Sequence, residues 1–145
     1  MYGVDSAVLP EYRSRGVGSK LMDARFAVLK QLNLRGMIAG SLIIDYHKVA
    51  SEVTPEQYVQ DVIDGKRFDT NLTKQLHKGF RVHNIIPNYF NDARTLNYGV
   101  GIVWQNPDFD PSRPILRTAK VIPAHFDVRL KPERTPEATF GAVGN

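Results

Sequence analysis

Residues 8–22 read VLPEYRSRGVGSKLM, and this stretch decides how the chain is expected to fold. An apolar segment ends at Pro10, which removes a backbone donor, so a strand is predicted to stop there. Gly16 and Gly18 follow, and then apolar residues return at three- and four-residue steps, the period of an amphipathic helix. The stretch therefore predicts a strand, a glycine-containing loop and a helix in direct succession.

The flanking segments extend this pattern into a mixed α/β fold. Residues 2–9 supply the first strand, and the helix is expected to run to about Asn33. The continuous apolar run over residues 36–44 predicts a second strand, buried on both faces and parallel to the first. The apolar face of the helix is predicted to consist of Val17, Leu21, Ala24, Val28 and Leu32.

Two further helices are marked by their terminal residues. Thr54 precedes Pro55 and stands three residues before Gln57, which is a helix-capping pattern. A short helix over residues 70–79 is expected next, ending in a glycine that stops it in the left-handed conformation. Its cap is Asp69 or Thr70.

The remaining chain divides into an antiparallel strand pair and a tail. Residues 80–86 and 98–105 predict the two strands. Six of the nine prolines follow Trp104, and no periodicity lasts beyond it. We therefore expect a domain over residues 1–106 and a proline-rich tail over residues 107–145.

Composition bounds the partners and the location. The chain has 145 residues, no cysteine and a net charge of +4. It shows no basic leader before an apolar block and no apolar run long enough to span a bilayer, so a cytoplasmic protein that does not interact with membranes is predicted. The positive charge favours polyanionic partners, either phosphorylated cofactors or nucleic acids.

The loop after the first strand has the chemistry of a phosphate site. Gly16 and Gly18 permit close backbone approach, while the helix that follows directs N–H groups and its positive dipole end to the same place. Arg13 and Arg15 add charge-assisted donors. The simpler alternative is a glycine-containing turn with surface arginines. Neither the Walker motif nor the dinucleotide fingerprint is present, which disfavours ATP and NAD.

The stretch AVLPEYRSRGVGSKLM resembles the acetyl-CoA-binding signature of the GNAT acyltransferase superfamily, [QR]-x-x-G-x-[GA], with Arg13, Gly16 and Gly18 in the three defined positions. The stretches DARFAVLKQLNLRGMIAG and LTKQLHKGFRVHNIIPNY resemble the GNAT domain fused to carbon-nitrogen hydrolases in some bacterial proteins. The resemblance covers about residues 2–104 and implies a partial GNAT fold, with a mixed sheet, a splayed parallel strand pair and an antiparallel pair at its C-terminal side.

The resemblance implies an acyl-CoA, most simply acetyl-CoA, as co-substrate and an amine as acceptor. The amine attacks the thioester directly, so no covalent enzyme intermediate is implied. Backbone groups near Ala7 and Val8 would meet the pantetheine arm. The pyrophosphate would lie against the residues of the loop and first helical turn, which are Ser14, Arg15, Gly16, Val17, Gly18 and Ser19.

Two departures from the family pattern leave a second reading open. Gln75 stands where many members carry a tyrosine that protonates the leaving thiolate, and a neutral amide has no proton to give. The chain also begins within the signature strand. It is therefore the C-terminal part of a longer protein, has a start further upstream, or forms a homodimer through its exposed first strand. The alternative function is a non-catalytic module that binds CoA or another partner.

Catalytic groups are not fixed by the sequence. Asp5 lies on the predicted first strand and is a candidate proton acceptor. Tyr46 and His47 follow the second strand at its carboxyl end, where open α/β sheets place ligands, and are candidates for substrate contact or proton transfer. The four histidines have no metal-binding spacing, and the basic residues do not alternate with aromatics, so neither a metal nor a nucleic acid is predicted.

Overall fold

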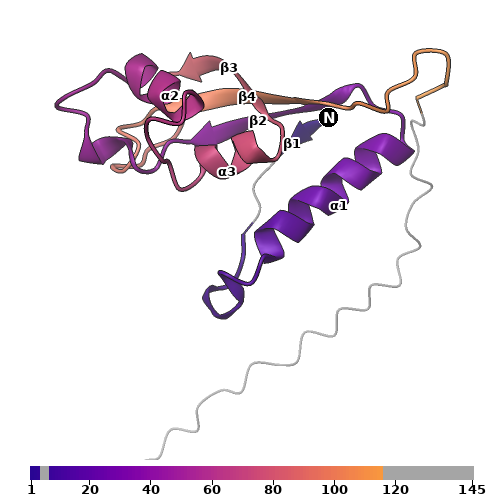
Figure 1. Cartoon of the computed structure of the whole chain (residues 1–145), viewed down its shortest axis with the longest axis horizontal. Helices are drawn as coiled ribbons and strands as arrows, with labels where there is room; N and C mark the ends of the chain where they lie inside the picture. The colour runs from indigo at the N-terminus through magenta and orange to yellow at the C-terminus, as the bar shows by residue number, and fades with distance from the viewer. Residues whose placement is uncertain (4–6, 116–145) are drawn as a thin grey trace, which may run out of the picture.

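The computed structural model describes residues 1–3 and 7–115, and these form one four-stranded mixed sheet with its helices (Figure 1). β1 pairs in parallel with β2, and β4 pairs antiparallel with both β2 and β3. The expected parallel pair and antiparallel pair are thus confirmed. The sheet order is β1-β2-β4-β3, with β1 (Tyr2–Gly3), β2 (Gly36–Leu42), β3 (Arg81–Ile86) and β4 (Gly99–Gln105).

The helices begin and end close to the residues that the sequence marks. The hydroxyl of Thr54 accepts a hydrogen bond from the backbone N–H of Gln57 at 3.2 Å, as the capping pattern predicts. Gly79 ends the short helix with a φ of 89°, a conformation that glycine adopts without strain. The helices are α1 (Val17–Gln31), α2 (Pro55–Ile63) and α3 (Leu72–His77), with short 3-10 helices η1 (Pro10–Tyr12) and η2 (Tyr46–Lys48).

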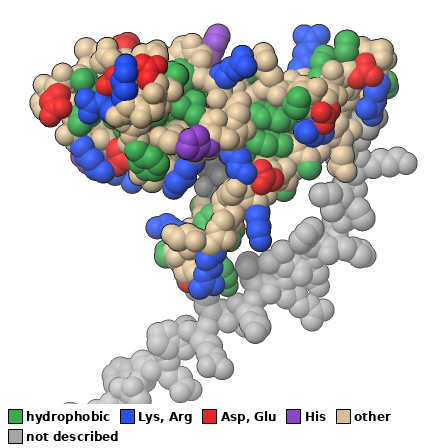
Figure 2. Space-filling view, viewed as in Figure 1, with side chains coloured by type: hydrophobic (Ala, Val, Ile, Leu, Met, Phe, Trp, Pro, Cys, Tyr) green, Lys and Arg blue, Asp and Glu red, His purple; other side chains and the backbone are tan. Residues whose placement is uncertain are grey.

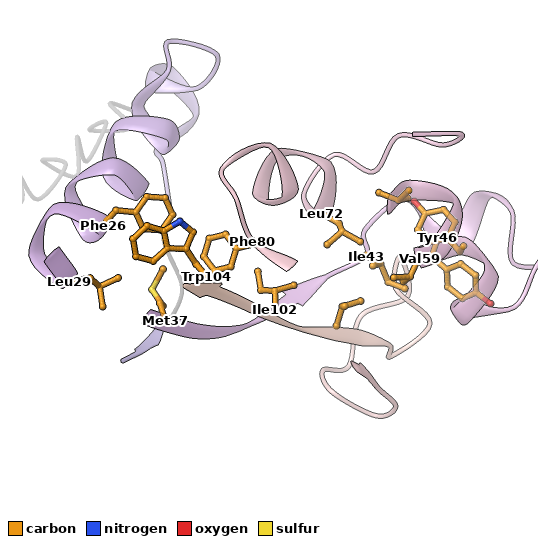
Figure 3. Close-up of a cluster of buried hydrophobic side chains, with 13 residues drawn as sticks. Phe26, Leu29, Met37, Ile43, Tyr46, Val59, Leu72, Phe80, Ile102 and Trp104 are labelled. Carbon is orange, nitrogen blue, oxygen red and sulfur yellow. The ribbon is translucent and has the colours of Figure 1, made fainter. Parts of the chain in front are cut away.

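The hydrophobic core lies on one face of the sheet, between the strands and the helices (Figure 3). At one end Phe26 of α1 stacks on Trp104 of β4 and also contacts Phe80. At the other end Ile43, Tyr46, Val59 and Leu72 join β2 to α2 and α3 (Figure 3).

The prediction that the second strand is buried on both faces is wrong. Successive residues of β2 alternate between the two faces, and Met37 is buried while Ile38 is 53% exposed. All three helices contribute their buried residues to the same core, so the opposite face of β2 has no helix over it in the described part of the chain. Tyr89 instead covers part of that face, above Gly40 and Gly99, where a Cβ would collide with its ring.

α1 also presents a different face from the one predicted. Phe26 and Leu29 are its buried residues, whereas Leu21 and Val28 are 40% and 44% exposed. The aromatic stack with Trp104 decides the orientation of the helix, because a phenyl ring buries more apolar surface than the smaller predicted residues. Met22 also packs against the core, so core contacts begin in the second turn of α1, and the N-terminal end of the helix before it projects from the sheet (Figure 1).

The first strand is shorter than predicted among the described residues. β1 contains Tyr2 and Gly3, while residues 7–9 lie outside any strand and η1 begins at Pro10. Pro10 occupies the first position of η1, so it begins a 3-10 helix and does not end a strand. Among the residues that the structure describes, no helix combines the length and apolar character needed to cross a bilayer.

The beginning of the predicted tail contacts the end of α1. The side chain of Asn33 donates to the backbone carbonyls of Asp110 and Arg113 and accepts from the N–H of Asp110. Lys30 pairs with Asp108 at 2.8 Å. The domain boundary at residue 106 stays a prediction, and residues 116–145 of the predicted tail lie outside the described residues.

Candidate functional site

The predicted phosphate loop lies at the projecting end of α1. Gly16 is the N-cap of the helix with a φ of 75°, and Ser14 has a φ of 58°, so two left-handed residues turn the chain into the helix. Within the described structure, the N–H groups of Val17, Gly18 and Ser19 have no backbone acceptor. The first backbone hydrogen bond of the helix runs from the N–H of Lys20 to the carbonyl of Gly16. These free donors sit at the positive end of the helix dipole.

Two arginines flank these donors. The guanidinium of Arg13 donates from Nε to the carbonyl of Val8 at 3.1 Å, which ties the loop to the segment before η1. Arg15 lies over the ring of Tyr12, 5.9 Å from its centroid. Both side chains are exposed, and Figure 2 shows Lys and Arg gathered on the projecting lobe that holds the loop. The lobe is therefore open and positively charged.

The other residues assigned to this site are placed as follows. Ala7 is exposed and Val8 half-buried, just before η1. A Cβ added at Gly16 or Gly18 would meet no atom within 4 Å, so the surface beside the loop is unobstructed. Asp5 lies outside the described residues. The structure thus brings the loop residues together, and the role of each stays a prediction.

A cavity of about 280 Å³ lies between α1, α3 and the edge of β2. β1 pairs with β2 only at Tyr2 and Gly3 among the described residues, so β2 from Gly40 onward is hydrogen-bonded there to β4 alone. Ala39 and Gly40 both line the cavity, which therefore lies along β2 next to its pairing with β1. Its lining comprises Tyr2, Gly3, Met22, Arg25, Met37, Ala39, Gly40, Leu42, Asn71, Gln75, Phe80, Tyr89 and Ile102.

The loop and the cavity share α1. Met22 and Arg25 line the cavity from this helix, and the distance along the axis from Val17 to Arg25 is about 12 Å at ~1.5 Å per residue. Lys78, which follows α3, pairs with Asp23 of α1 at 2.7 Å and links the two walls. An elongated ligand can therefore extend from the loop to the cavity along one side of α1.

α3 is held against the carboxyl end of β2 by two aspartates. The carboxylate of Asp69 accepts from the N–H groups of Asp45, Asn71 and Leu72 and from the hydroxyl of Tyr58. Asp69 is completely buried. Burial of the Tyr58 side chain, together with its contact with the Asp69 carboxylate, raises the pKa of Tyr58. The N-cap of α3 is Asn71, not the predicted Asp69 or Thr70, although Asp69 accepts from the N–H of Leu72, the first residue of the helix.

The carboxylate of Asp45 completes this junction. It accepts from the N–H and hydroxyl of Thr70 and pairs with Lys48 at 2.6 Å. These bonds, led by that to Lys48, hold the pKa of Asp45 at about 2. The start of α3, and with it Asn71 and Gln75, is consequently fixed relative to β2.

Tyr46 and His47 lie outside the cavity. The hydroxyl of Tyr46 donates to the carbonyl of Val53, its ring belongs to the core, and burial raises its pKa. Nδ1 of the exposed His47 lies 3.1 Å from the carbonyls of Ile44 and Arg94. Both residues therefore bind nearby backbone in the described structure, and neither lines the cavity.

Sequence reasoning did not single out Ser41, Asn71 or Tyr89 as site residues. Gly40 and Gly99 carried a signal for Tyr89, since glycine in a strand marks a close approach by another group. Ser41 and Asn71 carried no such signal, because they are 30 positions apart and meet only when α3 folds over β2. Gln75 was singled out only as a residue that cannot act as an acid.

Similarity to known proteins agrees with this architecture. The chain is 36% identical over 106 residues to the uncharacterized N-acetyltransferase YkwB of Bacillus subtilis, covering 73% of this chain and 47% of that protein. It is 35% identical over 131 residues to the probable hydrolase YhcX of the same organism, covering 90% of this chain and 25% of that protein. The chain thus spans about half of the length of YkwB and about a quarter of the length of YhcX. No family model matches it.

Two solved structures share the fold. One is the GphF GNAT-like decarboxylase in complex with isobutyryl-CoA, with a TM-score of 0.57, 23% identity and coverage of 68% of this chain and 52% of that one. The other is the loading GNATL domain of CurA from Lyngbya majuscula, with a TM-score of 0.52, 17% identity and coverage of 68% and 51%.

The mixed sheet with its short parallel pair has the fold of these GNAT-like domains. The chain is part of a domain of the GNAT superfamily.

Proposed function

We propose that the chain binds an acyl-CoA and transfers its acyl group to an amine, with acetyl-CoA as the simplest acyl donor. The observation that carries the proposal is the signature loop at the N-terminal end of α1. Its N–H groups and two arginines lie at this end of the helix, and the cavity lies further along the same helix. A solved structure that shares the fold contains isobutyryl-CoA, which supports binding of an acyl-CoA. The pyrophosphate would contact residues 14–19, and the thioester would reach the cavity.

In this proposal the protein acts mainly by positioning. The amine nitrogen attacks the thioester carbonyl, a C–N bond forms, and the C–S bond breaks with its electron pair passing to sulfur. Holding both reactants at one edge of β2 makes the attack effectively intramolecular.

A non-catalytic module that binds acyl-CoA is the second candidate. One observation favours it: the described residues that line the cavity include no carboxylate, histidine or lysine, and their ionisable side chains are Arg25, Tyr2 and Tyr89. A proton acceptor for the amine would then have to be water or a group outside this lining. The two candidates share the loop and differ in turnover.

Calorimetry with CoA tests the binding site. Gly16→Asp places a carboxylate beside the proposed pyrophosphate, and we expect at least a tenfold loss of affinity. Gly65→Asp is the matched control, because Gly65 also has a positive φ, 72°, and an added Cβ there also meets nothing within 4 Å. Backbone strain and added charge are thus alike, and Gly65→Asp should bind CoA as the unaltered chain does. Equal affinity of the two variants would disprove the assignment.

Turnover separates the two candidates. The chain is incubated with acetyl-CoA and a panel of amines, and released CoA is measured with a thiol reagent. Release that depends on an amine and is lost in Gly16→Asp supports the transferase. Tight CoA binding without release from any amine supports the non-catalytic module.

A further inference from the structure

A chain of hydrogen bonds runs from the backbone of β2 to the surface of the cavity. The side-chain amide nitrogen of Asn71 lies 3.2 Å from the carbonyl oxygen of Leu42 and 3.5 Å from the hydroxyl of Ser41. The hydroxyl of Ser41 lies 2.5 Å from the side-chain oxygen of Gln75. Ser41 is 1% exposed and stands behind the cavity lining, whereas Gln75 forms part of that lining.

The first member of this chain fixes the direction of every bond. A backbone carbonyl can only accept, so the atom of Asn71 that faces Leu42 must be its NH2 group. The same NH2 group faces Ser41, whose oxygen therefore accepts from it and whose proton is directed to Gln75. Gln75 must then present its carbonyl oxygen to Ser41. Its NH2 group is left as the end of the chain, and no acceptor for it is found among the described residues.

The chain of bonds behind this NH2 group makes it a stronger donor, because hydrogen bonds in a chain polarise one another. The cavity lining combines the apolar side chains of Met22, Phe80 and Ile102 with the polar side chain of Asn71. The charged or titratable groups that share the lining are Arg25 from α1, Tyr2 from β1 and Tyr89 from the segment between β3 and β4.

We propose that the NH2 group of Gln75 donates a hydrogen bond to the sulfur of an acyl-CoA bound in the cavity, and that Ser41 is a positioning residue that keeps the amide in this orientation. This inference rests on the proposed function. When the C–S bond breaks, its electron pair stays on sulfur. The sulfur then carries a negative charge, and the hydrogen bond that it accepts from the NH2 group of Gln75 becomes stronger. Gln75 keeps both its protons, and the amine proton leaves to water.

Free CoA tests this role without turnover, because its thiol titrates. With the chain in excess, so that all the CoA is bound, the pKa of the bound thiol is read from the ultraviolet absorbance of the thiolate as pH is raised. A donor at sulfur stabilises the thiolate, so we expect its pKa in the unaltered chain to be about one unit lower than in Gln75→Met, since one unit corresponds to roughly one hydrogen bond to a charged group.

Matched variants isolate the donor. Gln75→Glu keeps an oxygen for Ser41 but replaces the donor by a negative charge, so the thiol pKa should rise above that in Gln75→Met. Ser41→Ala should give an intermediate value, and Ser41→Thr, which retains the hydroxyl, should restore the low one. Gln105→Glu, an exposed position outside the cavity lining, adds the same charge and should leave the thiol pKa unchanged.

Two failures are distinguishable. If CoA binds in a manner sensitive to Gly16→Asp but its thiol pKa is the same in the unaltered chain and in Gln75→Glu, the role of Gln75 is disproved and the proposed function stands. If CoA does not bind to the unaltered chain, both proposals are disproved together.

Discussion

The ring of Phe26 lies parallel to that of Trp104, with centroids 4.1 Å apart and an interplanar angle of 9°. This stack joins α1 to β4, and Leu29, Met22 and the ion pair between Asp23 and Lys78 add further contacts that hold the helix. The position of the loop at the far end of α1 therefore depends on the contact between these two rings.

Phe26→Ala should lower the free energy of unfolding by about 3 kcal/mol, the usual effect of truncating a buried aromatic ring. CoA affinity should fall as well, because the orientation of α1 is then less well fixed. Urea denaturation and calorimetry provide the measurements. Val28→Ala, on the exposed side of the same helix, should change stability by less than about 0.5 kcal/mol. Equal effects of the two substitutions would contradict the orientation of α1 described above.

Asp69→Asn should destabilise the chain by about 2–3 kcal/mol. The new NH2 group would face two of the four donors that now share the carboxylate, leaving buried donors unsatisfied. Hydrogen exchange should show faster exchange at the N–H groups of Asn71 and Leu72. Asp108→Asn is the comparison: it loses only an exposed pair with Lys30, worth at most about 1 kcal/mol.

The stability contributed by Asp45 should depend on pH in a defined window. Its pKa is about 2 in the folded chain, against an ordinary value of 3.8. A lowered folded-state pKa stabilises the fold above the unfolded value, and this stabilisation is lost as pH falls through the folded value. The difference in urea midpoint between the unaltered chain and Asp45→Asn should therefore be constant above about pH 5 and shrink between roughly pH 4 and 2. A difference that is flat across this window would argue against the bonds to Lys48 and Thr70.

Two glycines should respond oppositely to alanine. At Gly36 a Cβ would lie 2.2 Å from the backbone oxygen of Trp104, so Gly36→Ala must displace a strand and should destabilise the chain by at least about 2 kcal/mol. At Gly18, inside α1, a Cβ meets nothing, and Gly18→Ala should stabilise by about 0.5–1 kcal/mol through its helix propensity. Thermal unfolding of both variants gives the answer. The same sign of change in both would be inconsistent with these surroundings.

We propose that two copies of the chain associate through β1. This strand stands at the edge of the sheet among the described residues, and Tyr2 is 59% exposed beside the 53% exposed Ile38. An uncovered apolar edge favours pairing with another strand. Light scattering over a range of concentrations should show a dimer that Tyr2→Lys weakens. A monomer at every concentration would rule out this association.

The sequence predicted those elements whose signals are local. The capping residues of α2 and the left-handed Gly79 depend on a few consecutive residues, and the structure confirms them. The buried faces of the strands and helices were harder to predict. The apolar run over residues 36–44 is compatible with a strand covered on one face and with a strand covered on both. The buried face of α1 depends on a partner ring about 80 positions away along the chain, which periodicity within the helix does not reveal.

The candidate site divides in the same way. The loop at residues 13–18 is a contiguous motif and could be predicted whole. The chain of bonds through Ser41 to Gln75 could not, since the atoms that fix its direction come from β2 and from α3.

The projecting end of α1 acts as a lever. Gly16 lies ten residues before Phe26, about 15 Å along the axis, so a rotation of roughly 10° at the aromatic stack moves the loop by about 2.6 Å. A displacement of this size spans the difference between a hydrogen bond to a phosphate oxygen and none. The position of the predicted phosphate loop is thus sensitive to an angle at its remote support, and the proposed contact with the pyrophosphate would depend on how Phe26 lies on Trp104.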